Sequence, residues 1–553
     1  MNSSKRILIV GGVAGGMSAA TRLRRQDERA EIVVFERGDY VSFANCGLPY
    51  FLGEVIPERE DLLLQTPQAL KDRFEIDVRV RHEVISIDTD AQTVLVRDLV
   101  AGSETHESYD DLVLSPGARP VVPPLPGIER ALTLRDLADV DRMHEAVAGG
   151  PQDAVIIGGG FIGLELAENL TRRGIGVTVI EAADQIMPPL DPEMAYLVEQ
   201  ELVRHGIRVE LGVQVTTIGD ETVTLSDGRD LRADLVVLAI GVQPESSLAR
   251  DAGIALGARG AIVVDDHQRT SVPHIFAVGD AVEKLNAVHG GSLLAPLANT
   301  ANRQGRLVAD VISGQDTRMR PTFGTAIVGL FDIAAGVTGA SEKRLRAEGR
   351  AFRAVHTHPF SHAGYYPGAE QMSIKLLIDP ETDAILGAQA VGGQGVDKRI
   401  DVLATAMSGG LKASELADLE LAYAPQFGSA KDPVNMLGFI AENLRDGMST
   451  TVQWNELSGR VESGSTVIDV RTRDEFQDAH IAHAINIPLD EIRERLNELP
   501  AGDLIVHCAV GQRGHTAARI LSQSGFAVSN LDGGLRTWQA GLRRAKETAF
   551  PSS

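Results

Sequence analysis

A glycine-rich turn occurs twice in this sequence, each time between an apolar strand and a helix, and this repeat strongly limits the folds open to the chain. The first copy lies in KRILIVGGVAGGMSAATRLRRQ (5–26) and the second in DAVIIGGGFIGLELAENLTRRGIGVTVIEAADQIMP (153–188). In each copy a second apolar strand follows and ends in a glutamate, Glu36 or Glu181. In a dinucleotide-binding βαβ unit, glycines admit the pyrophosphate, the helix N-terminus supplies N–H donors and the acid takes ribose hydroxyls. We therefore predict two Rossmann-like domains.

The two turns differ at one position. The middle glycine of the G-x-G-x-x-G pattern is Val13 in the first copy, whereas the second copy has all three glycines. The carboxylate of Glu181 suits the free 2′-hydroxyl of NADH, and the next residues, Ala182 and Ala183, provide no arginine for the 2′-phosphate of NADPH. The residues expected to bind the first dinucleotide are Gly11, Gly12, Ala14, Gly15, Gly16 and Glu36, and those expected to bind NADH are Gly158, Gly160, Gly163 and Glu181.

Two dinucleotide folds in one chain suggest an electron relay between two cofactors, and the natural pair is FAD, bound first, and a nicotinamide. Matching strand-then-glycine crossings support this interpretation: DLVLSPGARP (111–120), which contains Gly117, and DLVVLAIGVQPES (234–246). A third segment, TSVPHIFAVGDAVE (270–283), is a strand that ends in a Gly-Asp pair before a helical stretch.

Composition limits the class of protein. A chain of 553 residues is too long for one hydrophobic core, so we expect several domains. A formal charge of −23 argues against non-specific binding to nucleic acid or anionic membranes. Two cysteines cannot form a disulfide framework, and no apolar run is long enough to span a membrane. We expect a cytoplasmic protein with no nucleic-acid or membrane partner and no metal site.

The first cysteine, Cys46, lies in VSFANCGLPY (41–50), without a second cysteine nearby. Together with the two nucleotide units, this stretch resembles the FAD/NAD-linked disulfide reductase family over residues 1–440. Dithiol members carry Cys-x4-Cys, but Phe51 stands at the second position here. SFANCGLPY is similar to the single-cysteine branch, which contains coenzyme A disulfide reductases, NADH oxidases and peroxidases, and NADH-dependent persulfide reductases. A single thiolate attacks a sulfur–sulfur bond or is oxidised by peroxide to a sulfenic acid, and neither reaction requires a second protein cysteine.

The resemblance assigns roles to further residues. In that family, the aspartate that matches Asp280 hydrogen-bonds the ribityl chain of FAD. An aromatic residue that matches Phe161 gates the nicotinamide pocket. A purely structural role for Phe161, as a packed helix residue, is an equal alternative. Peroxidase-type members have a histidine where this chain has Ala14. The coenzyme A branch instead has two tyrosines that reach the cysteine of the opposite subunit and donate a proton to the leaving thiolate.

By this resemblance the tyrosines are Tyr423 and Tyr365, or its neighbour Tyr366, and the chain forms a homodimer through residues 325–440. Arg22 and Arg25 share one face of the helix after the first turn, where they suit the phosphates of coenzyme A, or are solvated surface charges. The positions that the resemblance assigns to the coenzyme A groove, besides those two, are Ser18, Ser42, Asn45, Lys71 and Asn302.

The second cysteine belongs to a different kind of domain. Cys508 ends the apolar strand LIVHC and begins the loop CAVGQRG, which opens a helix. Such a loop directs backbone N–H groups at the sulfur, and the helix N-terminus favours a thiolate or persulfide. The segment resembles a rhodanese sulfurtransferase domain, with its VIDVR…E, HI…AINIP and LDGG…W marks. Four residues separate Cys508 from Arg513, which suits a sulfane sulfur, whereas related phosphatases use five; Asp469 and Arg471 support the loop or are purely structural.

We predict an α/β protein with two Rossmann-like FAD and NAD domains, an α+β dimerisation domain and a C-terminal α/β rhodanese domain. The expected activity is NADH-dependent reduction of coenzyme A persulfide, polysulfide or coenzyme A disulfide at Cys46, coupled to sulfur carriage at Cys508. The alternatives are an NADH oxidase or peroxidase, and a sensor or sulfur-delivery protein. The predicted boundaries are 1–150 and 269–325 (FAD), 151–268 (NAD), 326–445 (dimerisation), 446–452 (linker) and 453–553 (rhodanese).

Overall fold

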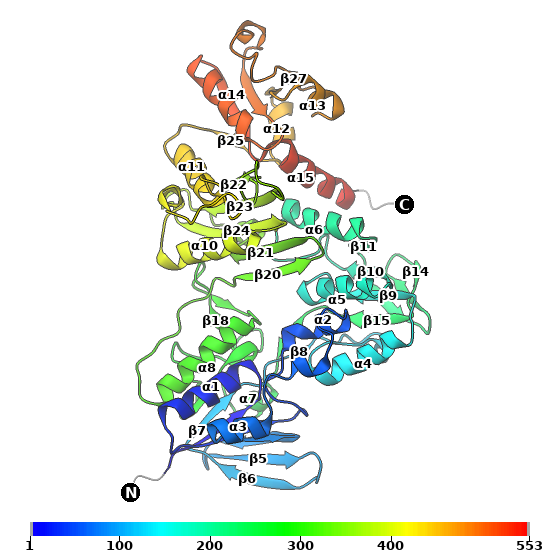
Figure 1. Cartoon of the computed structure of the whole chain (residues 1–553), viewed down its shortest axis with the longest axis vertical. Coiled ribbons are helices and arrows are strands. Elements are labelled where there is room, and N and C mark those ends of the chain that lie inside the picture. Colours follow the sequence, from blue (N-terminus) through cyan, green and yellow to red (C-terminus); the bar gives the residue numbers. More distant parts are fainter. Residues whose placement is uncertain (1–3, 550–553) are drawn as a thin grey trace. The chain divides into compact units, whose positions relative to one another are not determined.

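The computed structural model describes residues 4–549 (Figure 1). The outer ends of the first and last predicted domains, residues 1–3 and 550–553, lie outside it. Among the described helices, none has both the length and the apolar character needed to cross a membrane.

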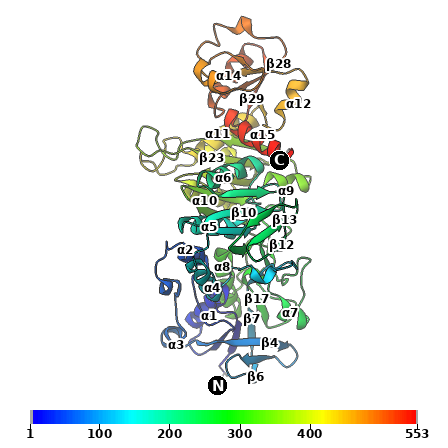
Figure 2. The same ribbon diagram turned by 90° about the vertical axis from the view of Figure 1, so that its right-hand side faces the viewer.

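The described chain falls into two compact units, and Figure 2 gives a second view of their elements. The first unit comprises the chain up to Glu181 together with Val213–Gly324. The second comprises Ala182–Gly212 and the chain from Thr325 onward.

The first glycine turn follows the central strand of a parallel five-stranded sheet. The strands, in their order across the sheet, are β17 (Ile275–Ala277), β7 (Asp111–Leu114), β1 (Arg6–Val10), β2 (Glu31–Glu36) and β3 (Asp77–Val80). Alternate residues of β1 enter different cores. Ile7 and Ile9 pack with α1 (Ala14–Gln26) and α8 (Ala298–Ile312), whereas Leu8 packs with the antiparallel strands β4 (His82–Asp88) and β5 (Thr93–Asp98). Because both faces are covered, the inner residues of β1, β2 and β7 are apolar and buried, whereas the edge strand β3 carries Asp77 and Arg79.

The second glycine turn follows the central strand of another parallel sheet in the same unit. Its strands within this unit, in their order across the sheet, are β10 (Gly176–Glu181), β9 (Asp153–Ile157) and β15 (Leu235–Leu238). The two predicted strand-then-glycine crossings meet, because β8 (Ala118–Pro120) pairs antiparallel with β16 (Val242–Pro244). The helices and antiparallel strands around this sheet are α4 (Leu137–Ala148), α5 (Phe161–Arg172), β12 (Val215–Ile218), β13 (Thr222–Leu225) and β14 (Asp230–Arg232).

Short elements complete the first unit, and the label η marks the 3-10 helices among them. They are β6 (Glu104–Ser108), η1 (Asn45–Gly47), α2 (Leu48–Leu52), η2 (Arg59–Leu62), α3 (Pro67–Phe74), η3 (Ile128–Arg130), α7 (Ser247–Asp251), η4 (Gly279–Ala281), β18 (Lys284–Leu285) and β19 (Ser292–Leu293).

The second unit contains an antiparallel sheet in which two neighbouring inner strands are buried along their whole length. The order is β20 (Ala326–Leu330), β21 (Ile333–Gly339), β24 (Ile385–Gly392), β23 (Met372–Ile378) and β22 (Arg353–Thr357). The strands β23 and β24 have no exposed residue, because helices pack against this sheet. The other elements are α6 (Pro192–Arg204), β11 (Arg208–Leu211), α9 (Glu342–Ala347), α10 (Val396–Gly409), η5 (Ser414–Asp418) and α11 (Pro433–Arg445).

The C-terminal part of the second unit is a parallel five-stranded sheet. Its order is β25 (Thr451–Val452), β29 (Ala527–Leu531), β28 (Asp503–His507), β26 (Thr466–Asp469) and β27 (Ile485–Asn486). The helices are α12 (Leu457–Glu462), α13 (Arg473–Asp478), η6 (Leu496–Glu498), α14 (Gln512–Gln523) and α15 (Gly534–Ala549). Leu504 and Val506 of β28 enter one core while Ile505 enters the other. The predicted fold class is confirmed: two Rossmann-type sheets, an α+β domain and a C-terminal α/β domain.

Candidate active site

Steric crowding requires the outer glycines of the first turn. The backbone of Gly11 has φ +102°, and a Cβ there would lie 2.1 Å from the Ser115 carbonyl oxygen. A Cβ at Gly16 would lie 2.0 Å from the carbonyl oxygen of Gly11. Val13 has a negative φ of −114°, so this position of the turn tolerates a side chain. The departure from the glycine pattern at Val13 therefore leaves the backbone path of the turn intact.

The second turn repeats this geometry. Gly158 has φ +114°, and a Cβ there would lie 2.3 Å from the Ala239 carbonyl oxygen, while one at Gly163 would lie 2.0 Å from the Gly158 carbonyl oxygen. Gly160, by contrast, has a negative φ of −86° and no heavy atom within 4 Å of its Cβ position. Open space at Gly160 is what close approach of a phosphate group would require.

The two glutamates at the strand ends are fixed in the same way. Glu36 accepts hydrogen bonds from the N–H groups of Gly12 and Gly38, both at 2.8 Å. Glu181 accepts one from Gly159, also at 2.8 Å. Each carboxylate thus lies beside its glycine turn, close to the N-terminus of the helix that follows. Phe161 begins α5 and is half-buried, a position compatible with either role considered for it.

Asp280 lies in η4, directly after β17. Its Oδ1 atom is buried and has no hydrogen-bond partner within the described chain. Burial raises the pKa of this carboxyl group, although Lys284 opposes the shift. A buried oxygen without a partner fits the hydroxyl group of a bound molecule. Gly117 has φ +74° and no atom within 4 Å of its Cβ position, so the first crossing is also open beside the strand.

Cys46 is exposed and lies in the 3-10 turn η1, which leads into α2. Although Cys46 is open to solvent on one side, the surrounding protein partly desolvates its thiol and raises its pKa, and the negative charges of Glu165 and Asp280 add to this shift. Beside Cys46, the hydroxyl group of Tyr50 donates a hydrogen bond to Glu165 at 3.2 Å. Cys46 is thus an accessible thiol near carboxyl groups from both nucleotide-binding halves. Ionisation of Cys46 is opposed by this environment.

The residues predicted for a coenzyme A groove occupy several places. Ser18 donates to Asn302 at 2.7 Å, which joins α1 to α8, and Arg22 forms an ion pair with Asp310 at 2.7 Å. Arg25 and Asn45 are exposed, and Ser42 has a positive φ of 48°. The structure thus brings Ser18, Asn302 and Arg22 together along two packed helices.

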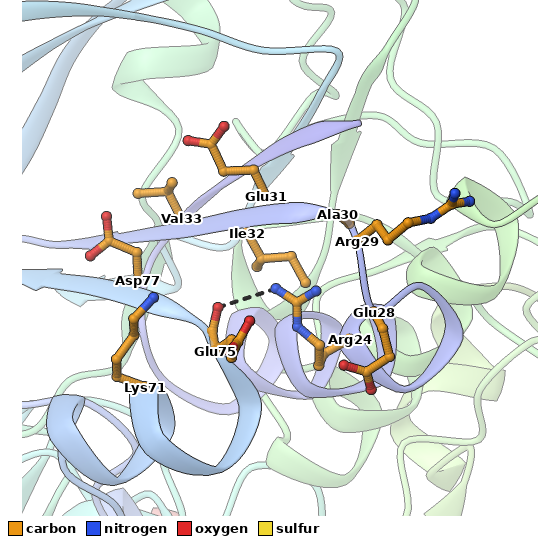
Figure 3. Close-up of a pocket in the computed structure, with 10 residues that line it drawn as sticks. All are labelled: Arg24, Glu28, Arg29, Ala30, Glu31, Ile32, Val33, Lys71, Glu75 and Asp77. Carbon is orange, nitrogen blue, oxygen red and sulfur yellow. Dashed lines mark hydrogen bonds between the residues drawn. The ribbon is translucent and has the colours of Figure 1, made fainter. Parts of the chain in front are cut away.

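Lys71 lies elsewhere, in α3, at a cavity of about 320 Å³ shown in Figure 3. The guanidinium group of Arg24 in this cavity donates to the Glu75 carbonyl oxygen at 3.1 Å. Acidic side chains, among them Glu75 and Asp77, also line it, so the cavity has mixed charge. Its charge does not select a phosphate, and Lys71 in the coenzyme A groove stays a prediction.

The domain built around the antiparallel sheet of β20 to β24 (the antiparallel domain) carries two exposed tyrosines that form a pair. The hydroxyl groups of Tyr365 and Tyr423 are 3.1 Å apart, and these residues are 77% and 49% exposed. Tyr366 instead packs edge-on against His362, with ring centroids 5.7 Å apart. The structure therefore pairs Tyr365, and not Tyr366, with Tyr423.

Cys508 is fully buried at the end of β28, in contrast to Cys46. Arg513, in the first turn of α14, makes two hydrogen bonds to Glu475, at 2.8 and 2.6 Å. This contact raises the pKa of Arg513 and lowers that of Glu475 to about 2. Glu475 was not among the predicted site residues, although it is the acid of the VIDVR…E mark. Glu475 therefore holds the guanidinium group of Arg513, which also lies close to Cys508.

Two further features support the Cys508 loop. Arg471 pairs with Asp469 at 2.6 Å, and both are buried beneath the loop strand, where Asp469 also lies 3.5 Å from the His507 ring. On the other side, the N–H of Leu535 donates to the carbonyl oxygen of Cys508 at 2.9 Å. A Cβ at Gly534 would lie 2.6 Å from that same carbonyl oxygen, so the LDGG turn needs its glycine to pack against the loop.

Fold and site together define a class: an oxidoreductase that binds two dinucleotides and carries one accessible cysteine, followed by a second cysteine loop on its own domain. The chain belongs to the pyridine nucleotide-disulphide oxidoreductase family, whose sequence signature matches residues 5–305. The dimerisation domain of that family matches residues 325–433, and a rhodanese-like domain matches residues 453–541. The family resemblance predicted from the sequence is confirmed.

Individual similar proteins indicate which members of this family the chain resembles. A coenzyme A disulfide reductase of Staphylococcus aureus (strain bovine RF122 / ET3-1) is 36% identical over 441 residues, which are 79% of this chain and all of that protein. The reduced CoADR-RHD of Bacillus anthracis has a TM-score of 0.97 and 46% identity, covering 98% of this chain and 99% of that one. A NAD-dependent persulfide reductase from A. fulgidus has a TM-score of 0.91 and 38% identity, covering 96% and 100%.

Proposed function

We propose that this chain is a homodimeric, cytoplasmic flavoenzyme that uses NADH to reduce the sulfur–sulfur bond of coenzyme A persulfide or coenzyme A disulfide at Cys46. Cys508 carries sulfane sulfur in the same pathway. The observation that carries the proposal is that the two cysteines of the sequence lie in opposite environments. One is accessible beside the nucleotide-binding halves, and the other is enclosed in a rhodanese-type loop. Both are unpaired, which fits a reducing compartment.

The residues present fit FAD and NADH. The first glycine cradle, with Glu36 and the partnerless oxygen of Asp280, suits FAD, and the second, with Glu181, suits the adenosine ribose of NADH. When bound, FAD conveys two electrons from the nicotinamide to sulfur. Among the relatives, the coenzyme A disulfide reductase supports the coenzyme A substrate and the persulfide reductase supports the persulfide.

In the proposed reaction, the Cys46 thiolate attacks one sulfur of the substrate, its bond to the other sulfur breaks, and a mixed disulfide forms at Cys46. The departing sulfur takes a proton from the Tyr365–Tyr423 pair of the other subunit. Two electrons and a proton from NADH then release the second thiol and restore the Cys46 thiolate, while one further proton from solvent reprotonates the tyrosine. For a persulfide the sum is RSSH + NADH + H⁺ → RSH + H₂S + NAD⁺. The exposed aromatic surface around Tyr365, Tyr423 and Phe427 supports a dimer contact there.

The first test is NADH oxidation by the purified, FAD-loaded chain with coenzyme A persulfide and with coenzyme A disulfide. We expect faster turnover with the persulfide, loss of both activities in Cys46→Ser, and slower turnover with NADPH because Glu181 repels its 2′-phosphate. Preference for the disulfide would move the assignment to thiol homeostasis. Turnover that survives in Cys46→Ser would refute the role of this cysteine.

A further inference from the structure

Two histidines of the antiparallel domain hold both ends of the turn that packs against the Cys508 loop. This turn is the LDGG turn together with the residues that follow it, up to Thr537. It lies in the C-terminal domain, and both domains belong to the second unit. At one end, the backbone N–H and the Nδ1 atom of His356 contact the Asp532 carboxylate at 3.0 and 2.6 Å. At the other end, the Nε2 atom of His358 lies 2.8 Å from the Thr537 hydroxyl group. The LDGG turn is therefore anchored outside its own domain.

The surroundings of His356 indicate an imidazolium ion. Its Nε2 atom lies 3.0 Å from the Glu193 carboxylate, while Nδ1 faces Asp532, so each ring nitrogen faces an acceptor and must donate. Burial alone would lower the pKa of His356, but Asp532 and Glu193 raise it to about 9, against a smaller opposing effect of Lys375. His358 differs because its two ring nitrogens contact the uncharged hydroxyl groups of Ser373 and Thr537, and burial lowers its pKa.

His356 is also part of a larger buried ion cluster. The ammonium group of Lys375 lies 2.6 Å from Glu193, 2.7 Å from Glu342 and 3.0 Å from Asp191. Lys375, Glu193 and His356 are almost completely buried. Removing one member of such a cluster leaves a buried charge without its partner, which is costly. The position of the His356 ring is therefore strongly determined by the antiparallel domain.

The turn is itself hydrogen-bonded to the loop that follows Cys508. Leu535 and Arg536 donate their N–H groups to the carbonyl oxygens of Cys508 and Ala509, at 2.9 and 3.0 Å. Every described peptide bond is trans, so the next N–H along the chain points opposite to each of these carbonyls. The N–H groups of Ala509 and Val510 are consequently directed away from the turn. The turn thereby sets the orientation of the first two peptide groups after the reactive sulfur.

We propose that His356, acting through Asp532, is a positioning residue for sulfur transfer at Cys508. Protonated His356 holds the turn, and the turn holds the loop amides in the orientation that stabilises a negatively charged sulfur. This proposal rests on the sulfur-carrying role proposed for Cys508. It makes the rhodanese site depend on a residue 152 positions earlier in the chain, in a domain of the reductase.

The test uses the full FAD-loaded chain, with thiosulfate as sulfur donor and cyanide as acceptor. Cys508 attacks the outer sulfur of thiosulfate and releases sulfite, and cyanide then removes that sulfur as thiocyanate and restores the thiolate. The variants are His356→Gln, Asp532→Asn and the double variant. Gln453→Ala is the matched control because Gln453 donates to the Ala354 carbonyl oxygen at 3.0 Å across the same domain contact, without touching the turn. Coenzyme A disulfide reduction is measured alongside.

We expect each single variant to lower kcat for thiocyanate formation at least about tenfold, with coenzyme A disulfide reduction and Gln453→Ala changed less than about twofold. The double variant should be no slower than the slower single variant, because both substitutions break one connection. In a Cys46→Ser background only Cys508 remains to react with iodoacetamide. The pH profile of that alkylation should shift to higher pH in both single variants, because misoriented amides stabilise the thiolate less.

Unchanged thiocyanate formation in folded variants would overturn the proposal, as would strictly additive losses in the double variant. Slower transfer with an unshifted alkylation profile would also overturn it, because His356 would then only dock the domains. If His356→Gln does not fold, Asp532→Asn decides alone, since its carboxamide keeps the size of the side chain and removes only the charge that faces His356. A wild-type chain that forms no thiocyanate would refute the sulfur-carrying function itself, and the alkylation profile would still test the positioning.

Discussion

Cys46 and Cys508 occupy opposite environments in one chain. Cys46 is exposed, lies on a short 3-10 turn, and has the carboxyl groups of Glu165 and Asp280 nearby. Cys508 is fully buried, ends a central strand, and has the Arg513 guanidinium group beside it. An accessible thiol can meet a substrate as large as coenzyme A, whereas an enclosed sulfur near positive charge and backbone amides suits a small anionic sulfur species.

The difference also concerns where each site obtains its support. The Cys508 loop is held by a buried pair beneath it, by Glu475 through Arg513, and by the LDGG turn on its far side. For Cys46 the described neighbours raise its pKa and so oppose its ionisation. The Cys508 loop is rigid, whereas Cys46 is accessible and its raised pKa opposes ionisation. The two sites should therefore differ in the substrates that they accept and in how their rates depend on pH.

Replacing each cysteine by serine should separate the two reactions, with the greatest loss of rate. Cys46→Ser should lower NADH-dependent reduction of coenzyme A disulfide by at least about 10³-fold, because serine cannot form the mixed disulfide. Thiocyanate formation from thiosulfate should persist in that variant. Cys508→Ser should show the reverse pattern. If either substitution abolishes both reactions in a folded, FAD-loaded dimer, the two sites are not separate.

The next largest effect should come from the charge beside Cys508. Arg513→Ala should lower kcat for thiocyanate formation by about 10²-fold, because it removes the cation that faces the developing sulfur anion. Arg519→Ala is the control, since Arg519 lies on the same helix but donates to the Met448 carbonyl oxygen. Steady-state assays of both variants suffice. Equal losses in the two variants would show that net charge on α14, and not the position of Arg513, controls the rate.

The tyrosine pair tests the Cys46 side. Tyr365→Phe should lower kcat for coenzyme A disulfide about tenfold, because one proton donor of the pair is lost while Tyr423 remains. Tyr366→Phe should change kcat less than about twofold, since its ring packs against His362 instead. The rates should be compared at saturating NADH. A larger loss in Tyr366→Phe would reverse the choice between the two neighbours.

Both cysteines and both glycine turns were recognisable in the sequence because local chemistry marks them. The turn has no room for a Cβ at Gly11 or Gly16, so glycine is required at both positions, whereas the negative φ of Val13 explains why a side chain fits there. His356 carries no such mark. Its partner Asp532 is 176 residues away, so only the folded chain brings the two together. Glu475 lies between these cases, since it was visible in the motif but its bond to Arg513 was not.

The smallest expected effect concerns the ionisation of Cys46. Burial and the carboxyl groups of Glu165 and Asp280 raise the pKa of this thiol, so its thiolate fraction at pH 7 is small and the rate should rise as the pH increases. Glu165→Gln removes one negative charge and should move the alkaline rise of kcat/KM for coenzyme A disulfide to lower pH. The gain at pH 7 should stay below about tenfold, because burial is the larger cause of the shift and persists in the variant. The control is Glu168→Gln, which lies one turn further along α5 and pairs with Arg172. Measured pH–rate profiles that coincide for the wild type and Glu165→Gln would mean that the reactive form of Cys46 is governed by groups other than its carboxylate neighbours.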